Sequence, residues 1–484
     1  MKNLKEILFK VTVDAIYGDT STLVKDICFS SKKVDRDSLF VAINGYNTDG
    51  HNFIDEAINN GASTIICEVL PKDFKKLKSV FVKVTCSKSA LSIISSNFYD
   101  NPSSKIDLIG ITGTNGKTTI SSLLFDLFNR FSINSGLIST INIKYGDQDI
   151  DSTNTTPDSK SINYHLAEMI KSNVKICFME VSSHGIDQKR IEGLSFKGVI
   201  FTNLTHDHID YHKSFANYRD TKKKIFDSLP NSSFSLINSD DRNSKYIIQN
   251  SKSKKYTYGI KNKSDFNSGI LEIQLDGMLL NIDKNEIWTK LIGDFNAYNI
   301  LAIYSLGKIY ELDTIRLLKT ISQLENVQGR LQSFITKDRV TVIIDYAHTP
   351  DALENVLKTI NKIRTMRQRL ITVVGCGGNR DTKKRPLIGN LVSELSSYVI
   401  FTSDNPRSEN PNEILKGILS GVSKTNFKKT NLIVKRDKAI EAAHKYSREG
   451  DIVLIAGKGH ENYQEINGEK IPFDDFKIAK QIFK

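Results

Sequence analysis

Residues 110–119 read Gly-Ile-Thr-Gly-Thr-Asn-Gly-Lys-Thr-Thr, the composition of a phosphate-binding loop. In such loops, backbone N–H groups and the N-terminus of the following helix face the anion, a lysine neutralises its charge and a threonine hydroxyl holds Mg²⁺. Lys117 and Thr118 carry the side chains for these two roles. Five residues rather than four separate Gly110 from Gly116, so the match to the full Walker pattern is partial. The segment predicts a site for ATP or GTP.

The segments that flank this loop have the periodicity that such a site requires. An apolar, strand-like run spans 106–111, and apolar residues at helical spacing follow over 120–128. An ordinary turn before a helix is the alternative interpretation, and the flanking periodicity argues against it.

Polar motifs also follow several other apolar, strand-like runs. Because the carboxyl ends of parallel strands share one edge of a sheet, where ligands bind, we expect these motifs to converge on one cleft. They occupy residues 179–184, 202–208, 345–348, 375–381, 404–407 and 457–461.

Two of these motifs could hold a metal ion. Glu180 offers the hard oxygen ligand that Mg²⁺ prefers. A zinc site is an alternative, because His208 and His212 are four residues apart and would share a helix face. No cysteine or glutamate nearby completes a tetrahedral set, so the sequence favours magnesium. For His206 and His212, ordinary capping and surface roles remain open.

The length of 484 residues predicts three domains, at about 150 residues per domain. The first is a small α/β unit with expected strands at 39–43, 64–67 and 80–84, expected helices at 53–60 and 91–99, and an exit turn at 100–104. The second contains an expected hairpin over 271–275 that turns at Asp276-Gly277. The third repeats strand and helix, with Thr349 and Pro350 at a helix start. Domain ranges of 1–103, 104–332 and 333–484 follow.

Composition excludes some classes of protein. No apolar run approaches the roughly 18 residues of a membrane span, so we expect a cytoplasmic protein. The net charge of +12 suggests nucleic-acid binding, but the basic residues are spread along the chain. A lysine-rich surface, or a cleft for anionic small substrates, explains the charge better. The five cysteines are scattered, which is typical of reduced thiols.

Four motifs together resemble those of the Mur ligases of peptidoglycan synthesis, namely residues 113–119, 180–184, 207–212 and 345–351. The resemblance implies an α/β fold of three domains. These are a small N-terminal α/β domain that binds a UDP-sugar, a central P-loop domain with a parallel sheet that binds ATP, and a C-terminal Rossmann-like, doubly wound domain that binds the incoming amino acid. The pattern is most similar to that of the family members that add diaminopimelate as the third residue.

The resemblance implies three sets of contact residues. The set for ATP is Gly113, Thr114, Asn115, Gly116, Lys117, Thr118, Thr119, Arg330 and Asp345. The set for UDP-MurNAc-L-Ala-D-Glu is Ser31, Tyr46, Asn47, Thr48, Asn154, Thr155, Thr156, Ser182, Gln188 and Arg190. The set for meso-diaminopimelate is Arg380, Asp404, Asn405, Pro406, Arg407, Gly457 and Glu461.

The implied reaction uses ATP and Mg²⁺ to convert a substrate carboxylate into an acyl phosphate, which the incoming amine then attacks. The implied catalytic residues are Lys117, Glu180, His208 and Lys222, and the implied metal ligands are Thr118, Glu180, His208 and Lys222. Lys222 would act as a carbamate, because CO₂ addition converts a repelled ammonium into an anion that binds Mg²⁺. From the residues alone, Lys222 is one of three adjacent lysines on a surface.

The resemblance also assigns the choice of third residue to Arg407, whose planar guanidinium can grip the distal carboxylate that lysine lacks. Two departures concern the substrate contacts. The family usually has Asp-Ser-Arg where residues 30–32 are Ser-Ser-Lys, and commonly has Asp at Asn379. A monomer without membrane or nucleic-acid partners is expected.

Three further functions stay open. A lysine-adding ligase of the same family would share every motif except the preference set by Arg407. A folylpolyglutamate synthase shares the phosphate loop but lacks the sugar-nucleotide domain and the 404–407 loop. A basic P-loop motor or switch would hydrolyse nucleotide in response to DNA or RNA and form no amide.

Overall fold

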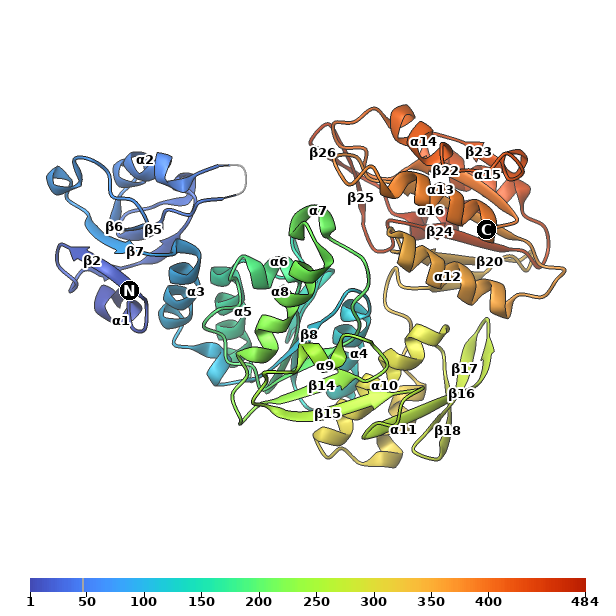
Figure 1. Ribbon diagram of the computed structural model, residues 1–484, viewed down its shortest axis with the longest axis horizontal. Coiled ribbons are helices and arrows are strands. Elements are labelled where there is room, and N and C mark those ends of the chain that lie inside the picture. Colours follow the sequence, from blue (N-terminus) through green and yellow to red (C-terminus); the bar gives the residue numbers. More distant parts are fainter. Residues whose placement is uncertain (46–47) are drawn as a thin grey trace.

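The computed structural model describes residues 1–45 and 48–484, and three sheets in chain order organise the fold. Figure 1 shows the three parts in a row, with the N-terminal part at one end and the central part between it and the C-terminal part. Tyr46 and Asn47, expected to contact the UDP-sugar, lie outside the described residues. Within the described residues, no helix has both the length and the apolar character needed to cross a membrane.

The N-terminal part is a five-stranded sheet in the order β2-β7-β6-β5-β4, with apolar clusters on both faces. Helix α3 (Ser87–Phe98) packs against helix α5 (Ser159–Lys171) of the central part, where the hydroxyls of Ser92 and Ser159 lie 2.5 Å apart. The elements are β1 Lys2–Asn3, α1 Leu4–Ile7, β2 Val13–Tyr17, β3 Leu23–Val24, β4 Asp26–Cys28, β5 Ser38–Val41, α2 Ile54–Asn59, β6 Ala62–Cys67, β7 Val80–Val84 and α3 Ser87–Phe98.

The central part contains an eleven-stranded sheet in the order β11-β10-β9-β12-β8-β13-β14-β15-β16-β17-β18. Its strands are β8 Asp107–Thr112, β9 Ser135–Ile138, β10 Asn142–Tyr145, β11 Gln148–Asp151, β12 Ile176–Glu180, β13 Gly198–Phe201, β14 Phe234–Asn238, β15 Lys254–Gly259, β16 Phe266–Gln274, β17 Gly277–Ile282 and β18 Asn285–Thr289. Its helices are α4 Lys117–Arg130, α5 Ser159–Lys171, α6 Ser183–Asp187, α7 Ile209–His212, α8 Phe215–Asp227, α9 Ser244–Ile247, α10 Asp294–Ile309 and α11 Thr314–Ser322.

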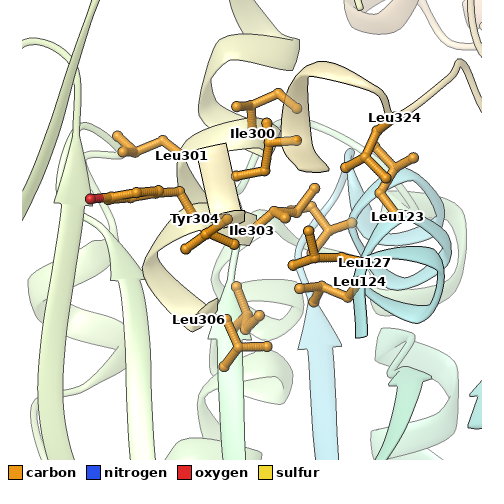
Figure 2. Close-up of a cluster of buried hydrophobic side chains, with 14 of the residues drawn as sticks. Leu123, Leu124, Leu127, Ile300, Leu301, Ile303, Tyr304, Leu306 and Leu324 are labelled. Carbon is orange, nitrogen blue, oxygen red and sulfur yellow. The ribbon is translucent and has the colours of Figure 1, made fainter. Parts of the chain in front are cut away.

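One face of this sheet is covered by α4 and α10, whose apolar residues interlock. Leu123, Leu124 and Leu127 of α4 meet Ile300 and Ile303 of α10, as Figure 2 shows, and all five side chains are almost completely buried. Burial of this kind stabilises a fold by about 1.5–3 kcal/mol per large apolar side chain. The packing fixes the N-terminus of α4, and therefore the phosphate loop, against the sheet.

The C-terminal part is a six-stranded sheet in the order β19-β20-β24-β21-β22-β23, with apolar clusters on both faces. This is the doubly wound arrangement expected from the sequence. Its elements are β19 Gln332–Ile335, β20 Thr341–Asp345, α12 Pro350–Ile363, β21 Leu370–Cys376, α13 Lys384–Leu395, β22 Tyr398–Ser403, α14 Pro411–Leu419, β23 Thr430–Leu432, α15 Arg436–Tyr446, β24 Ile452–Ala456, β25 Tyr463–Ile466, β26 Glu469–Pro472 and α16 Asp475–Ile482.

A fully buried ion pair lies behind the carboxyl ends of β22 and β24. The Arg436 guanidinium donates two hydrogen bonds to Asp475, at 2.8 and 2.7 Å, and others to the backbone carbonyls of Ser403 (3.4 Å) and Ala456 (2.9 Å). Burying a charge is costly unless the charge is fully paired. Here the two charges neutralise each other, and the arginine also connects the ends of β22 and β24 through its hydrogen bonds to their backbone carbonyls.

The central sheet differs from the expected parallel sheet. Strands β9, β12, β8, β13, β14, β15 and β16 pair in parallel, but antiparallel strands extend both edges: β10 and β11 at one, β17 and β18 at the other. The β16–β17 hairpin forms as expected, but its turn residues are Leu275 and Asp276, one position earlier than the predicted Asp276-Gly277, because Gly277 already pairs with Gln274 as the first residue of β17. The exact domain boundaries stay predictions.

Candidate active site

The phosphate loop connects β8 to α4, as the sequence predicts. Gly113 and Gly116 have positive φ of 152° and 89°, and a Cβ on Gly116 would lie 2.7 Å from Oδ1 of Asn299. Glycine is therefore required at Gly116 for backbone conformation and for space. The Nζ of Lys117 donates to the carbonyls of Gly113 (2.9 Å) and Thr114 (2.8 Å). Burial disfavours the charged form of Lys117 and lowers its pKa. A bound phosphate would stabilise the charged form again.

A fully buried carboxylate lies beside this loop. Glu180 ends β12, and its oxygens accept hydrogen bonds from the Thr118 hydroxyl (3.1 Å), the Thr140 hydroxyl (3.0 Å) and the Thr140 backbone N–H (2.7 Å). A carboxylate with two hydroxyls within hydrogen-bond distance of it forms the kind of hard oxygen set that Mg²⁺ binds. These residues fit a magnesium ion at the phosphate loop.

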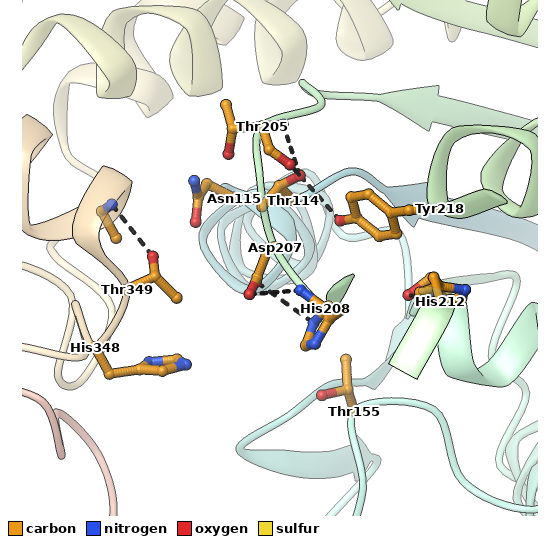
Figure 3. Close-up of polar contacts among 12 residues, drawn as sticks. Thr114, Asn115, Thr155, Thr205, Asp207, His208, His212, Tyr218, His348 and Thr349 are labelled. Carbon is orange, nitrogen blue, oxygen red and sulfur yellow. Dashed lines mark hydrogen bonds and ion pairs between the residues drawn. The ribbon is translucent and has the colours of Figure 1, made fainter. Parts of the chain in front are cut away.

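His208 lines the same cavity as Glu180 and is the N-cap residue of α7, with a left-handed φ of 53°, beside Asp207 (Figure 3). Desolvation lowers the pKa of His208 to about 3, despite the nearby carboxylate of Asp207, so the ring is neutral at pH 7. Asp207 itself has a lowered pKa, because His208 and Lys384 outweigh the effect of burial. A neutral imidazole offers a lone pair to a metal ion or to a bound water.

The structure argues against a zinc site at His208 and His212, an alternative that assumes that the two residues share a helix face. His208 precedes the four-residue helix α7 as its N-cap, in a left-handed conformation, so it does not share a helix face with His212. His212 ends the helix and is buried with its Nε2 3.0 Å from the Ser183 hydroxyl. No group of three or more histidine, cysteine or acidic side chains in the described residues could hold a metal ion. His212 therefore packs in the core, and His206 is exposed.

Lys222 is buried beneath the phosphate loop and is only 1% exposed. Its Nζ donates to the Gly113 carbonyl (2.9 Å) and lies 3.5 Å from the Thr112 hydroxyl. Burial, together with repulsion from Lys117, holds the pKa of Lys222 well below that of an ordinary lysine. The interpretation of Lys222 as a surface lysine is therefore wrong, whereas Lys224 of the same triplet is exposed.

A second group of predicted residues forms another wall of the same cavity. Thr156 connects the elements there: its hydroxyl donates to the Glu180 carbonyl (2.9 Å) and accepts from the Ser182 N–H (2.9 Å). Arg190 donates to the Thr156 carbonyl (2.6 Å) and the Gln188 side chain (2.7 Å). The arginine is thus held with its charge at the cavity wall, where it suits an anionic substrate.

The C-terminal part closes over the phosphate loop. Arg330 donates to the Thr118 hydroxyl (3.2 Å), and Lys384 on α13 pairs with Asp207 (3.1 Å). Asp345, at the end of β20, accepts from the backbone N–H groups of Leu331 (2.8 Å) and Ala347 (2.7 Å), which fixes the chain around Arg330. The two sheet edges therefore face each other across one cavity.

Asp351 makes the most direct bridge between the two parts. It lies in the first turn of α12, and its carboxylate accepts from the Asn115 amide (3.1 Å) and the Thr205 hydroxyl (3.0 Å). A carboxylate is also stabilised at this end of a helix.

We expect Asp351→Ala to lower kcat about tenfold or more, because two hydrogen bonds to a charged group no longer favour the closed arrangement. Steady-state kinetics would measure the change. Glu354→Ala is the matched control on the same helix, because Glu354 pairs with Lys358 of its own helix. Equal activity of the two variants would contradict the bridging role.

The cavity between the central and C-terminal parts has a volume of about 950 Å³. Most residues expected at the three substrates line it. They are Thr114, Asn115, Gly116, Lys117, Thr118, Thr119, Asn154, Thr155, Thr156, Glu180, Ser182, Gln188, Arg190, His208, Arg330, Asp345, Arg380, Asp404, Asn405, Arg407, Gly457 and Glu461. Ser31 and Thr48 belong to the N-terminal part, and the Ser31 hydroxyl donates to Glu56 (2.9 Å).

The loop 404–407 lines the wall of this cavity that the C-terminal part contributes, and it is hydrogen-bonded to the β25–β26 hairpin. The backbone of Arg407 exchanges hydrogen bonds with Glu465 and Asn467, and its Nε lies 3.0 Å from the Glu465 carboxylate. Its NH1 donates to the Gly378 carbonyl (2.9 Å). Pro406 lies against Gly378, where a Cβ would lie 1.9 Å from the proline carbonyl oxygen.

Sequence reasoning missed several cavity residues. Thr140, Asn296, Asn299 and Lys384 all line the cavity and lie outside every motif assigned to it from the sequence. A signal was available for two of them, because Asn296 and Asn299 lie in the motif 293–299, where a glycine precedes a helix start rich in asparagine. Thr140 gave no signal, because a single threonine after a short strand is common.

Comparison with known proteins agrees with this geometry. Three family models match: "Mur ligase family, catalytic domain" over residues 24–99, "Mur ligase middle domain" over 111–306 and "Mur ligase, glutamate ligase domain" over 329–459. UDP-N-acetylmuramoyl-L-alanyl-D-glutamate--2,6-diaminopimelate ligase of Cytophaga hutchinsonii is 46% identical over 99% of this chain and 98% of its own length. The protein of the same name from Phocaeicola vulgatus is 44% identical over 99% of both chains.

Among solved structures, one entitled as a UDP-N-acetylmuramoyl-L-alanyl-D-glutamate--2,6-diaminopimelate ligase covers 100% of this chain and 98% of its own, with a TM-score of 0.68 and 29% identity. The resemblance seen in four motifs thus extends over the whole length. On this similarity, together with a phosphate loop and polar strand ends facing one cavity, the chain belongs to the Mur ligase family.

Proposed function

We propose that this protein is an ATP-dependent ligase that joins meso-diaminopimelate to the D-glutamate γ-carboxylate of UDP-MurNAc-L-Ala-D-Glu, in the synthesis of the peptidoglycan precursor. The observation that carries the proposal is the single cavity that a phosphate loop, an anion-binding wall and the 404–407 loop line together. The names of the full-length relatives support the substrates. The protein would act in the cytoplasm as a monomer.

The first step would be attack of the γ-carboxylate on the γ-phosphorus of ATP, which breaks the bond to ADP and forms an acyl phosphate. Carboxylate and triphosphate repel each other, so the site must supply positive charge and fix the geometry. Lys117 and Arg330 would bind the phosphates, and Arg190 and Gln188 would orient the peptide. Magnesium, when bound, supplies further positive charge, and Thr118, Glu180, His208 and the carbamate of Lys222 would hold it.

The second step would be attack of the diaminopimelate amine on the acyl carbon, which expels phosphate and releases a proton as the amide forms. The C-terminal part must bring the amine from the 404–407 loop to the acyl phosphate. Closure through Asp351 and Lys384 would also exclude water, which otherwise hydrolyses the acyl phosphate.

Incubation of the purified protein with ATP, Mg²⁺, UDP-MurNAc-L-Ala-D-Glu and either diaminopimelate or lysine tests this function. We expect a product with the mass of the diaminopimelate tripeptide, one phosphate released per amide, and no product after chelation of the metal. Product with lysine alone would identify a lysine-adding ligase. Phosphate release that requires folate would identify a folylpolyglutamate synthase, and release that DNA or RNA stimulates without an amide product would identify a motor or switch.

A further inference from the structure

Lys458 is a fully buried lysine to which the proposed mechanism assigns no role. It follows β24, between Gly457 and Gly459, which both have positive φ. Its Nζ donates to Oε2 of Glu461 at 2.9 Å and to Oδ1 of Asn405 at 3.0 Å. An ammonium without access to water is costly unless it is paired. Both of its partners line the cavity, although Lys458 itself does not.

The contacts of Asn405 fix the orientation of its amide. Its Oδ1 accepts from the backbone N–H of Glu465 (2.9 Å) as well as from Lys458, and its Nδ2 donates to Oε2 of Glu461 (2.8 Å). An amide whose oxygen faces two donors cannot flip without losing both bonds. The Nδ2 group keeps one N–H that this network does not use.

The same contacts fix the Glu461 carboxylate. Oε2 accepts from both Lys458 and Asn405, whereas the hydrogen bonds among the described residues leave Oε1 without a partner. Glu461 lies at the cavity wall, so Oε1 is available to accept from an incoming ammonium group. The positive charge of Lys458 pairs with the Glu461 carboxylate from the side that faces the protein interior. The side that faces the cavity has no such partner among the described residues.

We infer that Lys458 is a positioning residue for the incoming diamino acid: it holds Asn405 and Glu461 in the geometry that receives the substrate amine and carboxylate. This inference rests on the proposed function, because it names what orients the amino-acid site of that reaction. Lys458 acts through its two partners and does not touch the substrate. Its loss therefore affects binding of the amino acid and leaves the phosphate chemistry intact.

Lys458→Met tests the inference, because methionine preserves the length of the side chain and removes its charge. With ATP and the UDP-dipeptide saturating, we expect KM for diaminopimelate to rise about tenfold, as for a lost charged hydrogen bond. We expect KM for ATP and kcat to stay within about threefold, a pattern that general damage to the fold would not produce. Lys470→Met is the control, because Lys470 is exposed and, like Lys458, lies over the Tyr463 ring.

The double variant Lys458→Met/Glu461→Gln keeps the test valid if the single variant folds poorly, because it leaves no unpaired buried charge. If Lys458 acts through Glu461 and Asn405, the effect of Lys458→Met on KM for diaminopimelate should be smaller in the Glu461→Gln protein than in the unmodified protein, because one of its two partners is already altered. Independent, multiplying effects would overturn the inference, as would an unchanged KM in Lys458→Met. Failure of the unmodified protein to ligate diaminopimelate would instead refute the proposed function.

Discussion

Lys222→Ala is expected to lower the ligation rate about a thousandfold, the scale of losing a group that stabilises transition-state charge. Lys222 lies beneath the phosphate loop with a carbonyl and a hydroxyl as its neighbours. An ammonium there would repel Mg²⁺ and Lys117. Burial lowers the pKa of Lys222, so the neutral amine, the form that adds CO₂, is more abundant at neutral pH. The resulting carbamate would supply a negative charge to the magnesium site.

Two measurements separate this role from a structural one. The intact mass of the protein, measured without acid, should include one added CO₂ that is missing in Lys222→Ala, and activity should fall when bicarbonate is removed and return when it is restored. Lys223→Ala is the matched control, because Lys223 is the next residue on α8 and pairs with Asp227. Activity of Lys222→Ala close to that of the control would refute the carbamate.

Arg407→Ala is expected to abolish the preference for meso-diaminopimelate over L-lysine. The two amino acids differ by one distal carboxylate, and two charged hydrogen bonds to it, at about 1.5–3 kcal/mol each, correspond to a loss in kcat/KM of about a hundredfold or more. Among the described residues, NH1 of Arg407 donates a hydrogen bond to Gly378 and Nε lies in an ion pair with Glu465, so NH2 remains for the substrate. Activity with lysine, which never had this contact, should change little.

A competition assay with both amino acids at equal concentration measures this preference as a ratio of products. Arg448→Ala is the control, because Arg448 is an exposed arginine of the same part of the chain. Retention of full preference by Arg407→Ala would exclude Arg407 as the discriminating residue. The selecting contact would then have to lie elsewhere in the 404–407 or 457–461 loops.

The sequence predicted which loops meet, and the reason is general. Parallel strands place their carboxyl ends on one edge, so polar residues after apolar runs, such as those at Asp345 and Asp404, could be assigned to one cleft from their positions in the chain alone. Helix starts were equally clear, because Thr349 and Pro350 are a cap and a first-turn proline. Strand ends and helix starts are determined by residues that are neighbours in the chain, so the local sequence pattern is enough to predict them.

Features that depend on distant contacts could not be predicted from the local pattern, and Lys222 was assigned to the site only through the resemblance to the Mur ligases. Lys222 and Lys224 are the same residue type in one lysine-rich segment, and only packing against the phosphate loop decides which of them is buried. Asp351 could be assigned to a helix start but not to a bridge with Asn115, because that contact joins two parts of the chain. The antiparallel edges of the central sheet likewise depend on pairing between short strands of weak pattern.

The buried pair of Arg436 and Asp475 has a practical consequence for redesign of specificity. It anchors the backbone at Ser403 and Ala456, immediately before the two selecting loops, and takes no part in selection itself. Libraries that vary the cavity-facing positions of the 404–407 and 457–461 loops can therefore keep this anchor unchanged. Variants that accept other amines should emerge there without loss of folding, provided that the anchor, the buried Lys458 and the positive-φ glycines Gly457 and Gly459 are all retained.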